Sequence, residues 1–320
     1  MIPTFVLKNI CAAALLCLCI HIANGQTDVD AIMMNKKVLC IGGVYSHSSW
    51  RDYWEGDFKR NNPNLGTVTT QSYSVMGSYG ITNKLNFLFN LPYIQTKASA
   101  GTLKKMKGIQ DLSLMLKWMP FLKHIGGKGI ISAYAIGGVS FPTTNYVADF
   151  LPLSIGMRSK TASIRLMADY QLGHFFATAS GIYVYRSNIE IDRNAYYTTQ
   201  LNYTNKVEMP DATGYNVRAG YRSDTWVAEG VVENSTTLGG FDIRKNDMPF
   251  PSNKMKATQA GVNIKYTIHA VPGLEVLGGY RFTIHARNMG QATTVYGGIF
   301  YIINFSGRNK TNGNTKTTQS

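Results

Sequence analysis

The sequence is poor in charge, in cysteine and in long apolar runs, and each shortage excludes a class of protein. Charged residues make up 16% of the 320 residues, whereas soluble domains average about 25%. Beyond residue 25, no stretch reaches the roughly 18 consecutive apolar residues that a membrane-spanning helix needs. Only Cys40 of the four cysteines lies beyond residue 25, so that part of the chain has no internal disulfide to stabilise it.

The first 25 residues have the pattern of a secretory signal peptide. Lys8 supplies a positive charge, and an apolar core from Ile10 to Ile22 is interrupted only by His21. Ala23-Asn24-Gly25 then places small residues at the positions a signal peptidase reads, which makes Gln26 the expected first residue after cleavage. A chain exported in this way does not meet nucleic acid, although its net charge is +14.

Several later segments alternate between apolar and polar residues. Between Ala162 and Leu172 every even position is apolar or tyrosine, and the odd positions are mostly polar. The segments Tyr215–Arg222 and Leu274–His285 have the same alternation. A period of two over about ten residues indicates strands with one apolar and one polar face. Strands of this length match the 9–11 residues that cross a bilayer in a β-barrel.

Twelve such strands are expected, joined alternately by short and long connections. The strands span about residues 38–48, 67–81, 84–95, 108–119, 129–142, 161–172, 174–186, 212–222, 225–236, 255–267, 274–285 and 293–305. The short connections are 82–83, 120–128, 173, 223–224 and 269–273, and the long ones are 49–66, 96–107, 143–160, 187–211, 237–254 and 286–292. Short turns at one end and long polar loops at the other are typical of outer-membrane barrels.

The predicted fold class is therefore all-β: a transmembrane antiparallel up-and-down β-barrel of about twelve strands in the outer membrane of a Gram-negative bacterium. The signal peptide covers residues 1–25, an N-terminal periplasmic segment or plug covers 26–37, and the barrel covers 38–305. The polar tail 306–320 is expected to be disordered.

Aromatic residues on the predicted outward faces gather at both rims. The short-turn rim carries Tyr79, Trp118, Tyr170, Tyr221, Trp226, Tyr266 and Phe305. The long-loop rim carries Tyr45, Tyr93, Tyr183 and Tyr185. Two aromatic girdles at the level of the lipid headgroups are a further mark of a membrane barrel.

Charged residues on the polar faces are the candidate pore-lining residues. They are Arg165, Asp169, Arg218, Arg222, Glu229, Lys265 and Arg281. One interpretation is that these residues form ion pairs that brace the lumen. The other is that the four arginines form a constriction that favours anions or carboxylates.

Three short motifs resemble an outer-membrane barrel family. Tyr79 to Leu85 reads Tyr-Gly-Ile-Thr-Asn-Lys-Leu, followed by Leu91-Pro92-Tyr93 and by Gly108 to Leu114. This order resembles the family named for the meta pathway of phenol degradation, which is related to the long-chain fatty acid channels. The upstream segment Ser49 to Gly56 is similar to uncharacterised barrels of the Bacteroidetes. The resemblance covers roughly residues 45–120 and implies passive passage of small, often hydrophobic compounds.

Enzymatic and metal chemistry lack a supporting motif. His47 and Ser49 share the outward face of the first strand, as a His/Ser pair does in outer membrane phospholipase A, itself a twelve-stranded barrel. Trp50 and Arg51 follow Ser49, so the motif supplies no asparagine to orient the histidine. The six histidines are scattered without the spacing of metal ligands, and no cofactor is expected.

The sequence thus predicts a non-enzymatic channel or uptake protein that passes a small hydrophobic or anionic solute passively. The alternative is a closed structural barrel whose loops 187–211 and 237–254 bind a protein partner, with a phospholipase-like enzyme a distant third. Besides the solute, the expected partners are outer-membrane lipid and lipopolysaccharide. The lipopolysaccharide is expected to meet basic loops such as Lys104-Lys105-Met106-Lys107.

Overall fold

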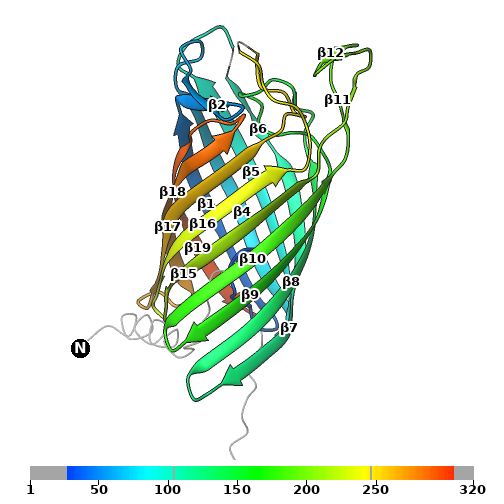
Figure 1. The fold of residues 1–320 in the computed structure, drawn as a ribbon. Helices are drawn as coiled ribbons and strands as arrows, with labels where there is room; N and C mark the ends of the chain where they lie inside the picture. The colour runs from blue at the N-terminus through cyan, green and yellow to red at the C-terminus, as the bar shows by residue number, and fades with distance from the viewer. Residues whose placement is uncertain (1–26, 104, 246, 306–320) are drawn as a thin grey trace, which may run out of the picture.

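A computed structural model describes residues 27–305 apart from 104 and 246, so the predicted signal peptide and polar tail lie outside the described residues. All regular elements within these residues are strands. Twelve long strands build the barrel (Figure 1). They are β1 (Val38–Trp50), β4 (Val68–Thr82), β5 (Leu85–Ala98), β7 (Asp111–Ile125), β8 (Gly129–Pro142), β9 (Thr161–Leu172), β10 (Phe175–Arg186), β15 (Ala212–Arg222), β16 (Trp226–Thr237), β17 (Lys256–Ile268), β18 (Leu274–Arg287) and β19 (Thr293–Asn304).

Each strand pairs with its antiparallel neighbours, and the ring closes between the first and the last. β1 pairs with β19 on one side and with β4 on the other, and the β4–β5 ladder completes the circuit. Because the ring is closed, no long strand leaves its backbone groups without partners inside the bilayer. The predicted all-β up-and-down barrel is confirmed, with one short extra strand, β6 (Met106–Ile109), paired to β5.

The predicted strand 108–119 and the turn after it are wrong in detail. The chain bends at Gln110, so β6 and β7 are separate strands. β7 then runs on through Pro120 to Ile125, and only residues 126–128 form the turn to β8. Pro120 lies where the β7–β8 register shifts between Trp118 and Phe121, and a bulge is a place where a strand tolerates the missing N–H of proline.

The outer face is apolar along the strands and aromatic at both rims. Leu166 and Ile164 on β9 are 62% and 54% exposed, as lipid-facing residues are in a chain without its bilayer. Trp226 and Tyr266 stack at the short-turn rim with their rings 4.4 Å apart. At the long-loop rim Tyr45 packs against Tyr73, with ring centroids separated by 5.0 Å. The two aromatic rims and the apolar belt between them identify the wall as membrane-facing.

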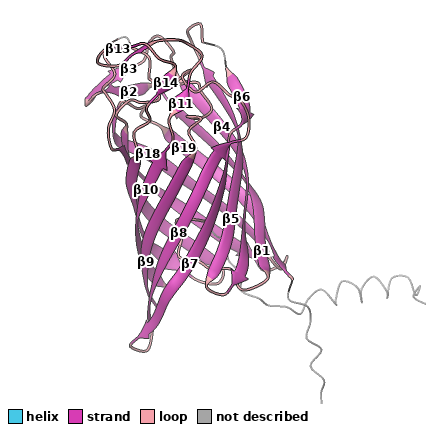
Figure 2. Cartoon of the chain, turned by 90° about the vertical axis from the view of Figure 1, so that its right-hand side faces the viewer, coloured by secondary structure: helices cyan, strands magenta, loops and turns pink. Residues whose placement is uncertain are grey.

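The long connections fold together over one end of the barrel (Figure 2). Short hairpins stiffen them, namely β2 (Asp52–Glu55) with β3 (Phe58–Asn61), β11 (Ile189–Glu190) with β14 (Lys206–Val207), and β12 (Tyr196–Tyr197) with β13 (Leu201–Asn202). A cluster of Ile189, Val207, Met209 and Phe250 joins two of the loops. We refer to residues 51–67, 143–160, 187–211 and 238–255 as the loop crown.

Candidate functional site

The chain before β1 lies inside the barrel, and we call residues 27–36 the N-terminal segment. At the short-turn rim the N–H of Lys37 donates to the carbonyl of Gly80 at 2.8 Å. The N–H of Lys36 donates to Asn83 Oδ1, also at 2.8 Å. Met34 is buried in a cluster with Val38, Cys40 and Phe300. The segment is therefore fixed to the rim by its last residues before its earlier residues pass into the lumen.

Lys117 of β7 binds the N-terminal segment from the wall. Its ammonium lies 2.6 Å from the carbonyl oxygen of Asp30, and 3.0 Å from those of Thr27 and Ile32. The Asp30 carboxylate is a fourth acceptor, at 3.1 Å. The Lys117 side chain is fully buried, and an ammonium has three donors to share among these oxygens. The segment thus curls around one buried cation.

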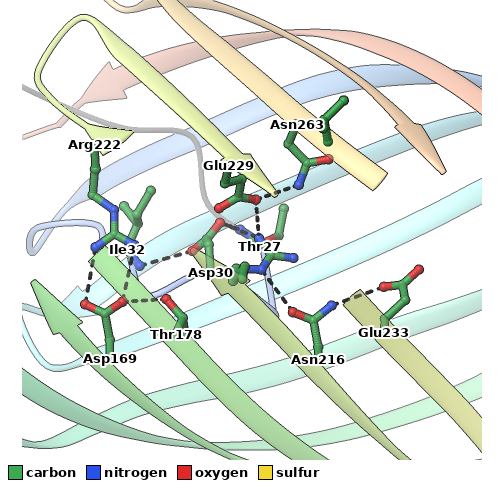
Figure 3. A network of polar contacts seen from close by, with 12 residues as sticks. Thr27, Asp30, Ile32, Asp169, Thr178, Asn216, Arg222, Glu229, Glu233 and Asn263 are labelled. Carbon is green, nitrogen blue, oxygen red and sulfur yellow. Dashed lines mark hydrogen bonds and ion pairs between the residues drawn. The ribbon is translucent and has the colours of Figure 1, made fainter. Parts of the chain in front are cut away.

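Two further wall residues bind the same segment. The Tyr134 hydroxyl on β8 donates to the carbonyl of Ala31 at 2.9 Å. Arg165 on β9 forms an ion pair with Asp28 at 3.3 Å. These contacts and the Lys117 contacts come from three neighbouring strands, so one side of the barrel holds the segment. Figure 3 shows Thr27, Asp30 and Ile32 among the side chains of the lumen.

The predicted pore-lining residues all face the lumen, and each of them is in an ion pair. Arg218 donates to Glu229 at 2.8 Å, with both side chains nearly fully buried. The other pairs are Arg222 with Asp169 at 3.3 Å, Lys265 with Glu275 at 3.8 Å, Arg281 with Glu233 at 3.6 Å, and Arg165 with Asp28. Each of these arginines is therefore paired with a carboxylate, as expected if ion pairs stabilise the lumen.

The lumen has two chemically different sides. Charged side chains come mainly from β9 and from β15 to β18, where the ion pairs above lie (Figure 3). Apart from Arg186 at the loop end of β10, the lumen-facing positions of β4, β5, β8 and β10 are uncharged, with residues such as Met76, Leu88, Ser140 and Ile182. Since the N-terminal segment binds β7, β8 and β9, it borders both sides.

A cavity lies on each side of the segment. The larger, about 270 Å³, is lined by Thr27, Asp28, Met76, Leu88, Asn90 and Met115, among others. The smaller, about 160 Å³, is lined by Thr27, Asp30, Arg218, Glu229, Lys265 and Arg281, among others. In the larger one the side-chain oxygen of Asn90 is buried and has no hydrogen-bond partner among the described residues. An open acceptor beside an apolar surface is the kind of polar group that orients a bound small molecule.

Asp28 and Asp30 are site residues that were not among those predicted from the sequence. The signal was the pair of carboxylates just ahead of the first strand, in a segment expected to be periplasmic or a plug. Their partners are distant in sequence, since Lys117 follows Asp30 by 87 residues. Only the closed barrel brings the two together.

His47 and Ser49 lie on the outer wall, where the phospholipase comparison placed them. Their strand partners on β4 are Gln71 and Thr69. The Gln71 amide donates to the Tyr45 hydroxyl at 2.9 Å, so it orients the tyrosine and not the imidazole. Within the described residues, no side chain forms a hydrogen bond with the His47 imidazole.

Comparison with known proteins shows the fold. No family model matches the chain, and no curated protein is similar to it in sequence. Among solved structures, an outer membrane channel from Pseudomonas putida F1 is similar with a TM-score of 0.68 and 14% identity, over 88% of this chain and all of the other. The translocator domain of the autotransporter NalP from Neisseria meningitidis gives 0.45 at 11% identity, covering 92% and 94% of the two chains.

A mutant of the monoaromatic hydrocarbon channel TodX also gives a TM-score of 0.45, at 8% identity and over 85% and 91% of the two chains. The match to the Pseudomonas channel extends over the whole of that protein and agrees with the closed ring of strands. The chain has the fold of an outer-membrane channel and is an outer-membrane β-barrel protein.

Proposed function

We propose that the protein is a passive channel for a small solute, closed at rest by its N-terminal segment. The observation that carries this proposal is the binding of the segment to Lys117, because a fully buried lysine of the wall holds carbonyls of residues 27, 30 and 32 inside the lumen. A segment held by side chains of Lys117, Tyr134 and Arg165 and joined to β1 at the rim is removable without unfolding the barrel. Its departure joins the two cavities that it borders.

The solute that fits best is small and mostly apolar, with one hydrogen-bond donor. Methionine, leucine and isoleucine side chains line much of the larger cavity, and Asn90 offers it an unused acceptor. An anion has less to bind here, because the arginines of the lumen are matched by carboxylates. The seven predicted pore-lining residues then stabilise the barrel through their ion pairs and set the width of the lumen. The uncharged side formed by β4, β5, β8 and β10 determines which solute passes.

The test of channel function compares the mature protein with a variant that lacks residues 27–34. Both are folded, shown to be heat-modifiable on gels, and inserted into planar bilayers. We expect a narrow or silent wild type and a steady conductance from the variant, with a reversal potential in a salt gradient that shows weak ion selectivity. A folded variant that stays silent would overturn the proposal that this segment closes the channel.

The test of the solute class uses block of that conductance. Cyclohexanol is expected to reduce the current of the variant lacking residues 27–34 more strongly than cyclohexane, which has the same ring and no donor. One net hydrogen bond of about 0.5–1.5 kcal/mol corresponds to a two- to tenfold difference. In the additional variant Asn90→Leu the two compounds should block equally. A preference that survives this substitution would exclude Asn90 as the acceptor.

A second function, binding of an extracellular partner, is favoured by one observation in the loop crown. A groove of about 760 Å³ runs between residues 185–211 and 238–252, and its lining includes Tyr185, Arg186, Tyr196, Glu208 and Asp211. Such a groove has room for a segment of a protein partner. If the protein binds a partner in this groove, the barrel remains closed. Binding of the partner should then be unchanged in a variant whose N-terminal segment is covalently attached to the barrel wall.

The remaining expectations complete the proposal. We propose that residues 1–25 are removed on export, that residues 306–320 form a polar tail, and that the basic outer rim meets lipopolysaccharide. N-terminal sequencing of the protein from outer membranes tests the first, with Gln26 expected as the first residue. Retention of residues 1–25 would contradict it.

A further inference from the structure

The outer wall formed by β1, β4, β5 and β6 carries a continuous row of aromatic rings. Strand register places Tyr45 opposite Tyr73, and Tyr73 opposite Tyr93. The ring centroids of the first pair are 5.0 Å apart, and those of the second are 6.4 Å apart. The row lies at the long-loop rim, the level at which aromatic girdles meet the lipid headgroups.

Three exposed lysines stand on the same face, just beyond this row. Gln95 lies two residues beyond Tyr93 and is opposite Lys107, and Lys97 lies two residues further along β5. Lys105 directly precedes β6 and is exposed as well. At about 3.4 Å per residue, Lys107 and Lys97 are roughly 7 Å and 14 Å past the aromatic row along the strands. The amines therefore extend over the headgroup region.

The charge on this face is of one sign. No Asp or Glu occurs between residues 68 and 110. Lys59 in the neighbouring loop illustrates the contrast, since it pairs with Asp52 at 3.5 Å. In the part of the chain that the structure describes, Lys97, Lys105 and Lys107 form no such ion pair. Three cations without carboxylates raise the local potential and attract an anion of similar extent.

We propose that this face is a binding site for the phosphate groups of a phosphorylated glycolipid of the outer leaflet. The lysines bind the phosphates, the tyrosine row packs against the headgroup sugars, and the acyl chains run down the apolar wall, where Val75 is 52% exposed. The proposal makes the lipopolysaccharide contact proposed above specific to three residues. It does not depend on the lumen being open, so it stands or falls separately from channel function.

The experiment measures lipid retention by native mass spectrometry. The mature protein in detergent is mixed with bisphosphorylated lipid A, with the dephosphorylated lipid, or with the phosphorylated lipid and an equal concentration of inorganic phosphate. A variant with K97Q, K105Q and K107Q is compared with a matched control that carries K84Q, K123Q and K128Q, three exposed lysines at the short-turn end. Both variants lose the same charge, and all six side chains are exposed, so neither removes a buried contact.

We expect the wild type and the control to retain the phosphorylated lipid and the first variant to lose it. A lysine near an anionic surface contributes about fivefold to binding, so three account for a loss of about a hundredfold. Retention by the wild type should also fall at 1 M salt, where the Debye length is about 3 Å. Equal retention by the two variants, or of the dephosphorylated lipid, would overturn the site. Displacement by inorganic phosphate at the lipid's own concentration would overturn its assignment to a lipid.

Discussion

Replacing Lys117 by Met should release the N-terminal segment and open the barrel. Methionine keeps the length of the side chain and removes the ammonium that binds Thr27, Asp30 and Ile32. The Asp30 carboxylate and three carbonyls are then left in the lumen without this donor. Removing one partner of a buried ion pair costs about 3–5 kcal/mol, which weakens docking of the segment by roughly 10²- to 10⁴-fold.

This loss falls on docking and not on the barrel, because Lys117 donates its hydrogen bonds to residues of the segment. The assay is single-channel recording in planar bilayers, with the open fraction as the measured quantity. Arg222→Met is the control, since it removes a lumen cation whose carboxylate partner, Asp169, belongs to the wall. We expect Lys117→Met to be open far more often than the wild type or the control. The reasoning is refuted if it stays as closed as the wild type while deletion of residues 27–34 opens the channel.

Three further predictions concern the rim and the loop crown. Gly80→Ala should raise the open fraction, because a Cβ at residue 80 meets the backbone carbonyl of Asn35; unchanged recordings would argue against this contact. Arg287 forms ion pairs with Asp57 and with Asp242, the latter at 2.6 Å. Arg287→Ala should therefore make residues 238–255 several-fold more sensitive to limited proteolysis, while the heat-modifiability of the barrel stays unchanged. Hydrogen bonds from Arg287 hold the pKa of Asp242 below its ordinary value. This contribution to loop order is therefore full above the unfolded pKa of about 3.9 and is lost as pH falls through the lower folded pKa; proteolysis that already increases between pH 6 and pH 5 would contradict the assignment.

The long strands could be predicted from the sequence because each contains its own alternation of apolar and polar residues. The alternation in residues 161–172, 212–222 and 293–304 is local, and the observed bounds agree with the predicted ones to within one residue. Where the prediction failed, at Pro120, the local preference of proline to end a strand was overridden by pairing with β8 and absorbed by a bulge. The short strands of the loop crown have two to four residues, too few for a period to be visible.

The sequence predicted which charged residues line the lumen, but not which of them form ion pairs with one another. Period two was enough to place Arg218, Arg222 and Arg281 on the inner face. Which carboxylate each meets depends on barrel curvature and strand tilt, and Arg222 illustrates this, since it reaches past β10 to Asp169 on β9. The binding of Asp30 to Lys117 has no local signal at all, because the segment has no regular structure and contacts a strand 87 residues away.

The attachment of the N-terminal segment to β1 sets how the channel recloses. Lys37, which joins the two, has a φ of +62° and its N–H is bound to Gly80, so the point of attachment is fixed even when the segment is out. Ten freed residues reach at most about 33–36 Å from that point, and a short flexible link of this kind gives an effective concentration in the millimolar range. Reclosure is thus a first-order event that does not depend on how much protein the membrane holds. A free peptide copied from residues 27–36 would have to be supplied at millimolar levels to compete with it.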